Sequence, residues 1–223
     1  MKKLLFTLLC LFALTGVAQE ISLIPQPAEM KVNEGKFLFR GKVVLCYPKI
    51  KDSGIDAVVD NFVDEMKAAT GIKLKKDRFK NAKLHGFDVI KNNKKGDAHI
   101  VLSVDESMGD EAYRLSVYAK RIDITAAKPA GFFYAFQTLK QLMPRNVMAG
   151  VYTTCFTMAL GHYDCLPMEY PIPCVEIEDE PRFGWRGFML DEGRHFYGKE
   201  EIKKILDVMA AYKMNRFHWH LTE

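Results

Sequence analysis

The sequence has few of the features that mark a membrane, metal-thiolate or nucleic-acid-binding protein. Its five cysteines include no C-x-x-C pair, the spacing that is typical of a thiolate zinc site. Lysine and arginine (32) exceed aspartate and glutamate (28) by only four, and no basic stripe stands out, so we expect no nucleic-acid partner. Its 48% hydrophobic and 27% charged content favours an ordinary globular protein.

The one long apolar run stands at the start of the chain and predicts a secretory signal peptide, residues 1–18. Lys2 and Lys3 precede this run, residues 4–14, and the small residues that end at Ala18 provide a cleavage site. The run is too short to span a bilayer comfortably. We therefore expect an exported protein, periplasmic or extracellular, with no transmembrane segment after cleavage.

Four cysteines remain after such a cleavage: Cys46, Cys155, Cys165 and Cys174. Export permits disulfide bonds, and four cysteines allow three pairings. Buried thiols fit the spacing equally well. The sequence therefore leaves the pairing open.

Residues 19–145 predict an α+β domain, with an antiparallel sheet and two helices. Apolar residues recur at helical spacing in residues 55–70, which Gly71 closes, and again in residues 130–143 before a proline. Alternation on both sides of residues 119–120 predicts an antiparallel hairpin. Strands with helices on one face of their sheet are typical of the α+β class.

Residues 146–180 are interpreted as a linker that contains a short strand and an acidic turn. The next segment, residues 181–223, predicts a strand, a helix and a second strand joined by short links. Such strands are parallel, which makes one βαβ unit. One unit cannot cover its own sheet, so we expect exposed apolar faces and weak hydrogen-exchange protection in residues 184–223.

Polar residues gather where these two expected strands end. They are Asp191, Glu192, Arg194 and His195 after the first strand, and His218, His220 and Glu223 on the second. In parallel α/β folds, ligands and catalytic groups lie beyond the carboxyl ends of the strands. The cluster is therefore a candidate active-site floor, and solvated loop charges with core histidines are the structural alternative.

Several stretches resemble glycoside hydrolase family 20, the exo-acting β-N-acetylhexosaminidases. "WRGFMLDEGRHF", "IKKILDVMAAYKMN" and "FHWHLTE" resemble the start of the family's catalytic (β/α)8 TIM barrel. "LIPQPAEMKVNEGKF" and the segment 111–144 resemble the small α+β domain before that barrel. The resemblance covers nearly all of the chain after residue 18 and is weakest over 145–171. It implies an amino-terminal fragment: the small domain and the first βαβ of the barrel.

The resemblance implies release of terminal GlcNAc or GalNAc from glycans that contain N-acetylhexosamine, with no cofactor. In this family the acetamido group of the substrate attacks the anomeric carbon, so the enzyme needs no nucleophile of its own. An Asp-Glu pair on a later strand, beyond Glu223, protonates the leaving oxygen and orients the acetamido group. Asp-Glu pairs of this chain, such as those at 64–65, 110–111, 179–180 and 191–192, stand in other contexts. We therefore expect no catalytic residue in this chain and no activity of the fragment alone.

Individual residues receive roles only through this resemblance. Arg186 matches the arginine that binds the hydroxyl groups of the terminal sugar, as a guanidinium fork is suited to do. Glu223 matches a position, usually Asp, that supports the network around the catalytic acid; Glu is one methylene longer. His220, Asp191 and His195 are expected to be supporting residues.

Two alternatives use other features of the sequence. His218 and His220 form an H-x-H pair on one face of a strand, as in the metal sites of amidohydrolase-like barrels. Because no further ligand cluster accompanies this pair, our main expectation includes no metal site. The other alternative is a non-catalytic carbohydrate-interaction module, which would bind N-acetylhexosamine without hydrolysing it.

Overall fold

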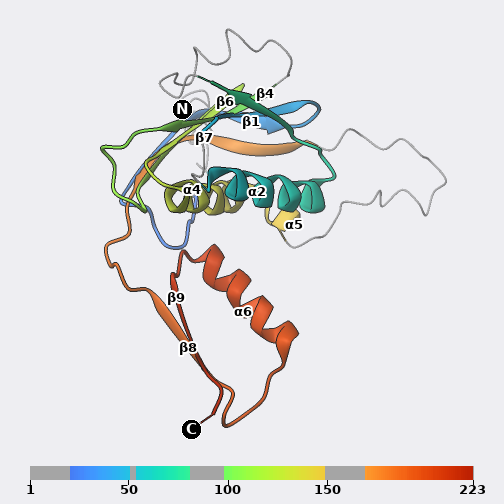
Figure 1. The fold of residues 1–223 in the computed structure, drawn as a ribbon. Helices are drawn as coiled ribbons and strands as arrows, with labels where there is room; N and C mark the ends of the chain where they lie inside the picture. The colour runs from blue at the N-terminus through green and yellow to red at the C-terminus, as the bar shows by residue number, and fades with distance from the viewer. Residues whose placement is uncertain (1–20, 51–53, 81–97, 149–168, 223) are drawn as a thin grey trace, which may run out of the picture.

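The computed structural model describes residues 21–50, 54–80, 98–148 and 169–222 (Figure 1). A small domain with a large sheet is followed by a strand-helix-strand unit. The expected signal peptide, residues 1–18, lies outside the described residues, as do Cys155, Cys165 and Glu223.

The elements of the small domain are β1 (Glu29–Phe39), β2 (Val43–Pro48), α2 (Ile55–Thr70), β3 (Lys75–Phe79), β4 (Ala98–Val104), β5 (Tyr113–Tyr118), β6 (Arg121–Ala126), α4 (Pro129–Leu142), α5 (Arg145–Met148) and β7 (Tyr170–Asp179). They are followed by β8 (Gly187–Asp191), α6 (Lys199–Ala211) and β9 (Arg216–His220). The expected hairpin is confirmed, since β5 and β6 pair directly across residues 119–120.

The sheet of the small domain is mixed, with strand order β1-β7-β5-β6-β4-β2-β3. The pairs β1–β7, β7–β5 and β5–β6 are antiparallel, whereas β6–β4, β4–β2 and β2–β3 are parallel. The expected α+β fold is therefore confirmed, but a wholly antiparallel sheet is wrong. The reason is visible at β2 and β3, because α2 connects them and a helical crossover returns the chain in the same direction.

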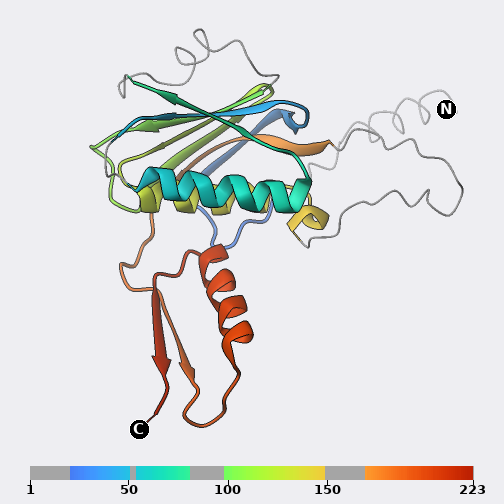
Figure 2. The ribbon, with the colours of Figure 1, turned by 45° about the vertical axis from the view of Figure 1, so that its right-hand side comes forward.

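Helices α2 and α4 lie side by side on one face of this sheet (Figures 1 and 2). Their apolar faces meet where the ring of Phe62 stacks on that of Phe136, with centroids 4.0 Å apart. Helix α2 ends as expected at Gly71, whose φ of 72° belongs to the left-handed region that glycine adopts without a Cβ clash. The inner side chains of the sheet and the two helices form one continuous apolar core.

Strand β7 confirms the short strand expected within residues 146–180 and makes it part of the sheet of the small domain. Residues 170–179 lie inside the sheet between β1 and β5, with Ile172 and Val175 fully buried. The partners of β7 are far away in the sequence, so local composition could not reveal this pairing. Cys174, also in β7, is buried, which raises the pKa of its thiol, and it forms no disulfide with another described cysteine.

The last segment forms the predicted βαβ unit. Strands β8 and β9 pair in parallel, in register from Gly187↔Arg216 to Asp191↔His220, and α6 connects them. Helix α6 ends at Ala211, with Tyr212 as its C-cap. The unit lies on the helical side of the small domain, with the amino ends of both strands towards it and the carboxyl ends pointing away (Figure 2).

Within the described residues, no helix combines the length and apolar character that crossing a bilayer requires.

Candidate functional site

The carboxyl ends of β8 and β9 bring Asp191 and His220 together. Oδ1 of Asp191 lies 3.1 Å from Nδ1 of His220 and also accepts the backbone N–H of Arg194 at 3.2 Å. The hydrogen bond from His220 is the main reason that the pKa of Asp191 is held below its usual range. An ionised carboxylate at Nδ1 favours the tautomer with its proton there and leaves Nε2 available to a ligand.

Arg194 carries the most accessible charge of this cluster. Its Nε lies 3.2 Å from Oδ2 of Asp191, yet its side chain is 83% exposed. Such an exposed ion pair contributes little to stability. The guanidinium group is thus loosely held beside the strand ends, where its fork of N–H groups can donate to a ligand.

Glu192 organises the loop between β8 and α6. Its carboxylate accepts the backbone N–H groups of Tyr197 at 3.0 Å and Gly198 at 3.1 Å, and the indole N–H of Trp219. Glu192 is only 6% exposed, so these donors replace the water that an ionised carboxylate needs. The sequence grouped Glu192 with the polar cluster and gave it no role of its own, because its three donors come from the loop and from β9.

The other expected supporting residues lie at the edge of this cluster or beyond the described residues. His195 is exposed, and its ring packs edge-on against that of Tyr197, with centroids 4.7 Å apart. Glu223 follows the last described residue, so its expected supporting role stays a prediction.

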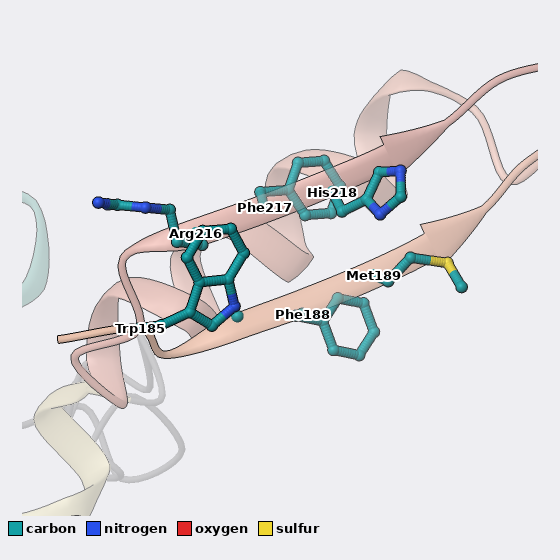
Figure 3. A pocket seen from close by; sticks show the side chains of 7 residues that line it. Trp185, Phe188, Met189, Arg216, Phe217 and His218 are labelled. Carbon is teal, nitrogen blue, oxygen red and sulfur yellow. The ribbon is translucent and has the colours of Figure 1, made fainter. Parts of the chain in front are cut away.

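A shallow hollow of about 350 Å³ lies beside the cluster, along the β8–β9 sheet (Figure 3). Its walls are mainly apolar or aromatic: Trp185, Gly187, Phe188, Met189, Arg216, Phe217 and His218. Trp185 is 73% exposed and Met189 55%, and the guanidinium carbon of Arg216 lies 5.5 Å from the centroid of the Trp185 ring. The expected exposure of apolar faces in this unit is therefore confirmed.

The H-x-H pair is divided between these two surroundings. His218 lines the hollow, whereas Nδ1 of His220 is engaged by Asp191. The ring centroids are 6.4 Å apart and the ring planes are 84° apart. The described residues include no group of three or more His, Cys, Asp or Glu side chains that could hold a metal ion. They therefore supply no third ligand to the pair.

Arg186 lies at the opposite end of β8. Its Nη1 donates to Oε2 of Glu111 at 2.9 Å and to the carbonyl of Phe183 at 2.6 Å. Its Nε donates to the carbonyl of Lys213 at 2.7 Å, and its Nη2 to the hydroxyl of Tyr134 at 2.9 Å.

These contacts hold Arg186 against the small domain, with only 15% of its side chain exposed. The sugar-binding role implied by the resemblance does not fit this position. The physical reason is that Arg186 precedes β8, and the amino end of β8 faces the small domain (Figure 2).

Comparison with known proteins places both parts of the chain in one family. Residues 20–180 match the model of "Glycosyl hydrolase family 20, domain 2", and residues 183–223 match the model of that family's catalytic domain. A "Beta-hexosaminidase" of Porphyromonas gingivalis is 32% identical over 239 residues, covering 100% of this chain and 27% of the relative. A "Beta-N-acetylhexosaminidase" of Cellulomonas fimi is 37% identical over 122 residues, covering 55% and 21%.

Solved structures agree. The GH20 β-N-acetylhexosaminidase of Streptomyces coelicolor superposes with a TM-score of 0.67 at 30% identity, covering 89% of this chain and 34% of its own. The enzyme from Bacteroides fragilis gives a TM-score of 0.62 at 28% identity, covering 90% and 32%. The chain spans about a quarter of the length of the two sequence relatives named above. With family models matching both of its parts, the chain belongs to glycosyl hydrolase family 20.

Proposed function

We propose that this chain provides the small domain and the first barrel strands of an exported β-N-acetylhexosaminidase. The enzyme would release terminal GlcNAc or GalNAc from glycans by the substrate-assisted retaining mechanism. The observation that carries the proposal is the match of residues 183–223 to the family's catalytic domain, because this segment contains the polar cluster at the strand ends. Export is proposed from the sequence of residues 1–18 alone.

In this proposal Arg194, rather than Arg186, binds the hydroxyl groups of the sugar. Arg194 stands at the carboxyl end of β8, is exposed, and has N–H groups to donate. Arg186 stands at the other end, and its guanidinium nitrogens already donate to four acceptors of the protein. Barrel enzymes bind substrate at the carboxyl ends of their strands, which favours Arg194.

Asp191 and His220 have a supporting role beside that arginine. The hydrogen bond with His220 holds the pKa of Asp191 below its usual range and fixes the orientation of the His220 ring. The same carboxylate positions Arg194 through both its backbone N–H and its Nε. Asp191 therefore contacts both Arg194 and His220, so a sugar bound by Arg194 lies close to His220.

Four of the five Asp-Glu pairs in the described residues lie away from the carboxyl ends of β8 and β9. Residues 64–65 lie in α2, 105–106 follow β4, 110–111 precede β5, 179–180 end β7, and 191–192 end β8. In the last pair both carboxylates already accept hydrogen bonds from the loop and from β9. We therefore propose that residues 1–223 alone do not hydrolyse the substrate.

A hybrid enzyme tests this proposal. Residues 1–223 replace the matching part of the Porphyromonas gingivalis relative, and both the hybrid and the chain alone are assayed with p-nitrophenyl N-acetylglucosaminide. The hybrid should turn over the substrate and the chain alone should not. In the hybrid, Arg194→Lys should raise KM because one donor group replaces a fork, whereas Lys203→Met on the exposed face of α6 should change nothing. Turnover by the chain alone, or a folded but inactive hybrid, contradicts the proposal.

A further inference from the structure

The turn between α6 and β9 contains a lysine in a backbone conformation that usually belongs to glycine. Lys213 has a φ of 58°, and its N–H donates to the carbonyl of Ala210 at 3.0 Å. Glycine is common just after a helix end because it adopts this conformation without a steric cost from Cβ. Yet Lys213 is only 3% exposed. A strained and buried lysine here indicates that its side chain has a task that glycine could not perform.

The ammonium group of Lys213 lies among side chains of the small domain. Nζ is 2.7 Å from Oδ2 of Asp179, at the end of β7, and 2.7 Å from the hydroxyl of Tyr113, at the start of β5. That hydroxyl donates to the same Oδ2 at 2.9 Å and lies 2.6 Å from the hydroxyl of Thr138 in α4. Oδ1 of Asp179 accepts the N–H of Ala28 at 3.2 Å. Both charges are thus hydrogen-bonded away from water.

This pairing has to be in place for the turn to be buried at all. Burial lowers the pKa of Lys213, and the hydrogen bond to Asp179 opposes that shift. Burial also raises the pKa of Tyr113, which therefore keeps its proton and can donate to the carboxylate. A buried ion pair is not a general source of stability, but the loss of one partner is costly, because the other charge remains buried without compensation. The contact therefore specifies where the turn must dock.

A second polar contact holds the same end of the unit. Arg186, just before β8, binds Glu111 and Tyr134 of the small domain. The side-chain amide of Asn215, just before β9, donates to the same Glu111 at 3.0 Å. The amino ends of both strands are therefore attached to the small domain.

We infer that Lys213 is a latch through which the small domain holds the first strand-helix-strand unit of the barrel. The surface formed by Asp179, Tyr113 and Thr138 then has an internal partner, the turn between α6 and β9, and is not a binding site for an outside ligand. The small domain acts as a base that fixes the amino ends of β8 and β9. This role does not depend on the hydrolytic activity proposed above.

Hydrogen exchange on the full chain tests the latch without any measurement of activity. The variants are Lys213→Met and Lys213→Gly, with Lys203→Met as the matched control, since Lys203 lies on α6 with 54% of its side chain exposed. Both Lys213 variants should speed exchange in β8 and β9 by at least about tenfold, because the unit opens more often. The control should leave the exchange rates unchanged.

The glycine variant separates a latch from a residue that only ends a helix. If Lys213 only ends α6, glycine relieves the strained conformation, exchange at the end of α6 slows, and β8 and β9 do not change. That result overturns the inference.

If a Lys213 variant unfolds completely, a double variant that removes both charges keeps the inference testable. If Lys213→Met unfolds the small domain, the double variant with Asp179→Asn should restore protection in β5 and β6 but not in β8 and β9. Restored protection in all four strands overturns the latch, because the unit would then be held without it.

Discussion

The small domain and the βαβ unit are stabilised in different ways. The small domain buries one continuous apolar core between its sheet and the two helices. In the βαβ unit, by contrast, the buried hydrophobic side chains among the described residues are Leu190, Ile202 and Met209, and two charged residues, Glu192 and Lys213, are also buried. The unit therefore has little core of its own, and hydrogen bonds and ion pairs to the small domain have to hold it.

This difference also explains the apolar residues that remain exposed. Phe183, Trp185, Phe196 and Leu221 are all more than half exposed, and they belong to the unit or its approach. Trp185 also lines the apolar hollow along β8 and β9, and a large exposed apolar patch marks a surface that contacts other protein. In the enzyme proposed above, further barrel elements would cover these side chains.

We expect the largest loss of stability when a side chain in the core of the small domain is truncated. Phe136→Ala removes a ring that is 2% exposed and stacked on Phe62, and we expect a loss of about 3–5 kcal/mol in the free energy of unfolding. Phe188→Ala in the unit removes a ring that is 42% exposed, and we expect a loss below about 1 kcal/mol. Urea denaturation followed by far-UV circular dichroism measures both. Equal losses would mean that the two parts share one core.

The next effect separates two arginines of the same segment. Arg186→Met leaves the carboxylate of Glu111 without its main partner, and we expect about 2 kcal/mol less free energy for local opening of β8 and β9. Arg194→Met breaks only an exposed pair and should cost less than about 1 kcal/mol. Hydrogen exchange in β8 and β9, with β5 and β6 as the internal reference, gives both values. The comparison fails if Arg194→Met has the larger effect.

Local patterns in the sequence predicted the helices and strands. They could not show which strands pair, because the pairing depends on segments that are distant in the chain. The periodicity of residues 55–70, the glycine at 71 and the alternation around 119–120 correctly predicted α2, its end, and the β5–β6 hairpin. The parallel pairs of β2 and the place of β7 depend on partners distant in the chain. No local pattern encodes which strand will lie beside them.

The same reason explains the outcome at the candidate site. The grouping of Asp191 and His220 could be predicted, because both stand at the ends of parallel strands, and the structure brings them within 3.1 Å. The position of Arg186 could not, since its acceptors, Glu111 and Tyr134, belong to the other domain. Only a weak signal in the sequence pointed to the role of Lys213, because it is a lysine just after a helix end, where glycine is favoured.

A smaller effect on hydrogen-exchange protection in β8 and β9 is expected as the pH falls. Glu111 faces Arg186, Asn215 and Tyr134, and its hydrogen bond with Arg186 is the main cause of a pKa below its usual range. A carboxyl group whose pKa is lower in the folded state stabilises that state above its unfolded pKa, and this stabilisation is lost as the pH falls through the folded pKa. Between about pH 5 and pH 3, protection factors in β8 and β9 should therefore fall more than those in β5 and β6.

The control for this acid effect is Glu111→Gln, which carries no titrating group. Its protection factors should be lower at pH 5 and should change less between pH 5 and pH 3. Asp191, whose pKa is also lowered by its hydrogen bond with His220, lies at the far end of β8, so Asp191→Asn is measured beside it. If protection in Glu111→Gln falls between pH 5 and pH 3 as much as in the unchanged chain, the contact between Glu111 and Arg186 is not the source of the pH dependence.

The smallest effect is expected at Glu192, where the unit stabilises its own loop without the small domain. Glu192→Gln keeps one carbonyl acceptor but loses the negative charge that accepts the N–H groups of Tyr197 and Gly198, just before α6, where the helix dipole favours an anion. We expect about 1 kcal/mol less protection in the first turn of α6 and a shift of the Trp219 indole proton in NMR spectra. Glu200→Gln changes an exposed carboxylate in the first turn of α6, which pairs with Lys203, and should have less than half the effect. Equal effects of the two variants would show that charge near the helix end, and not the buried contacts of Glu192, orders the loop that carries Arg194.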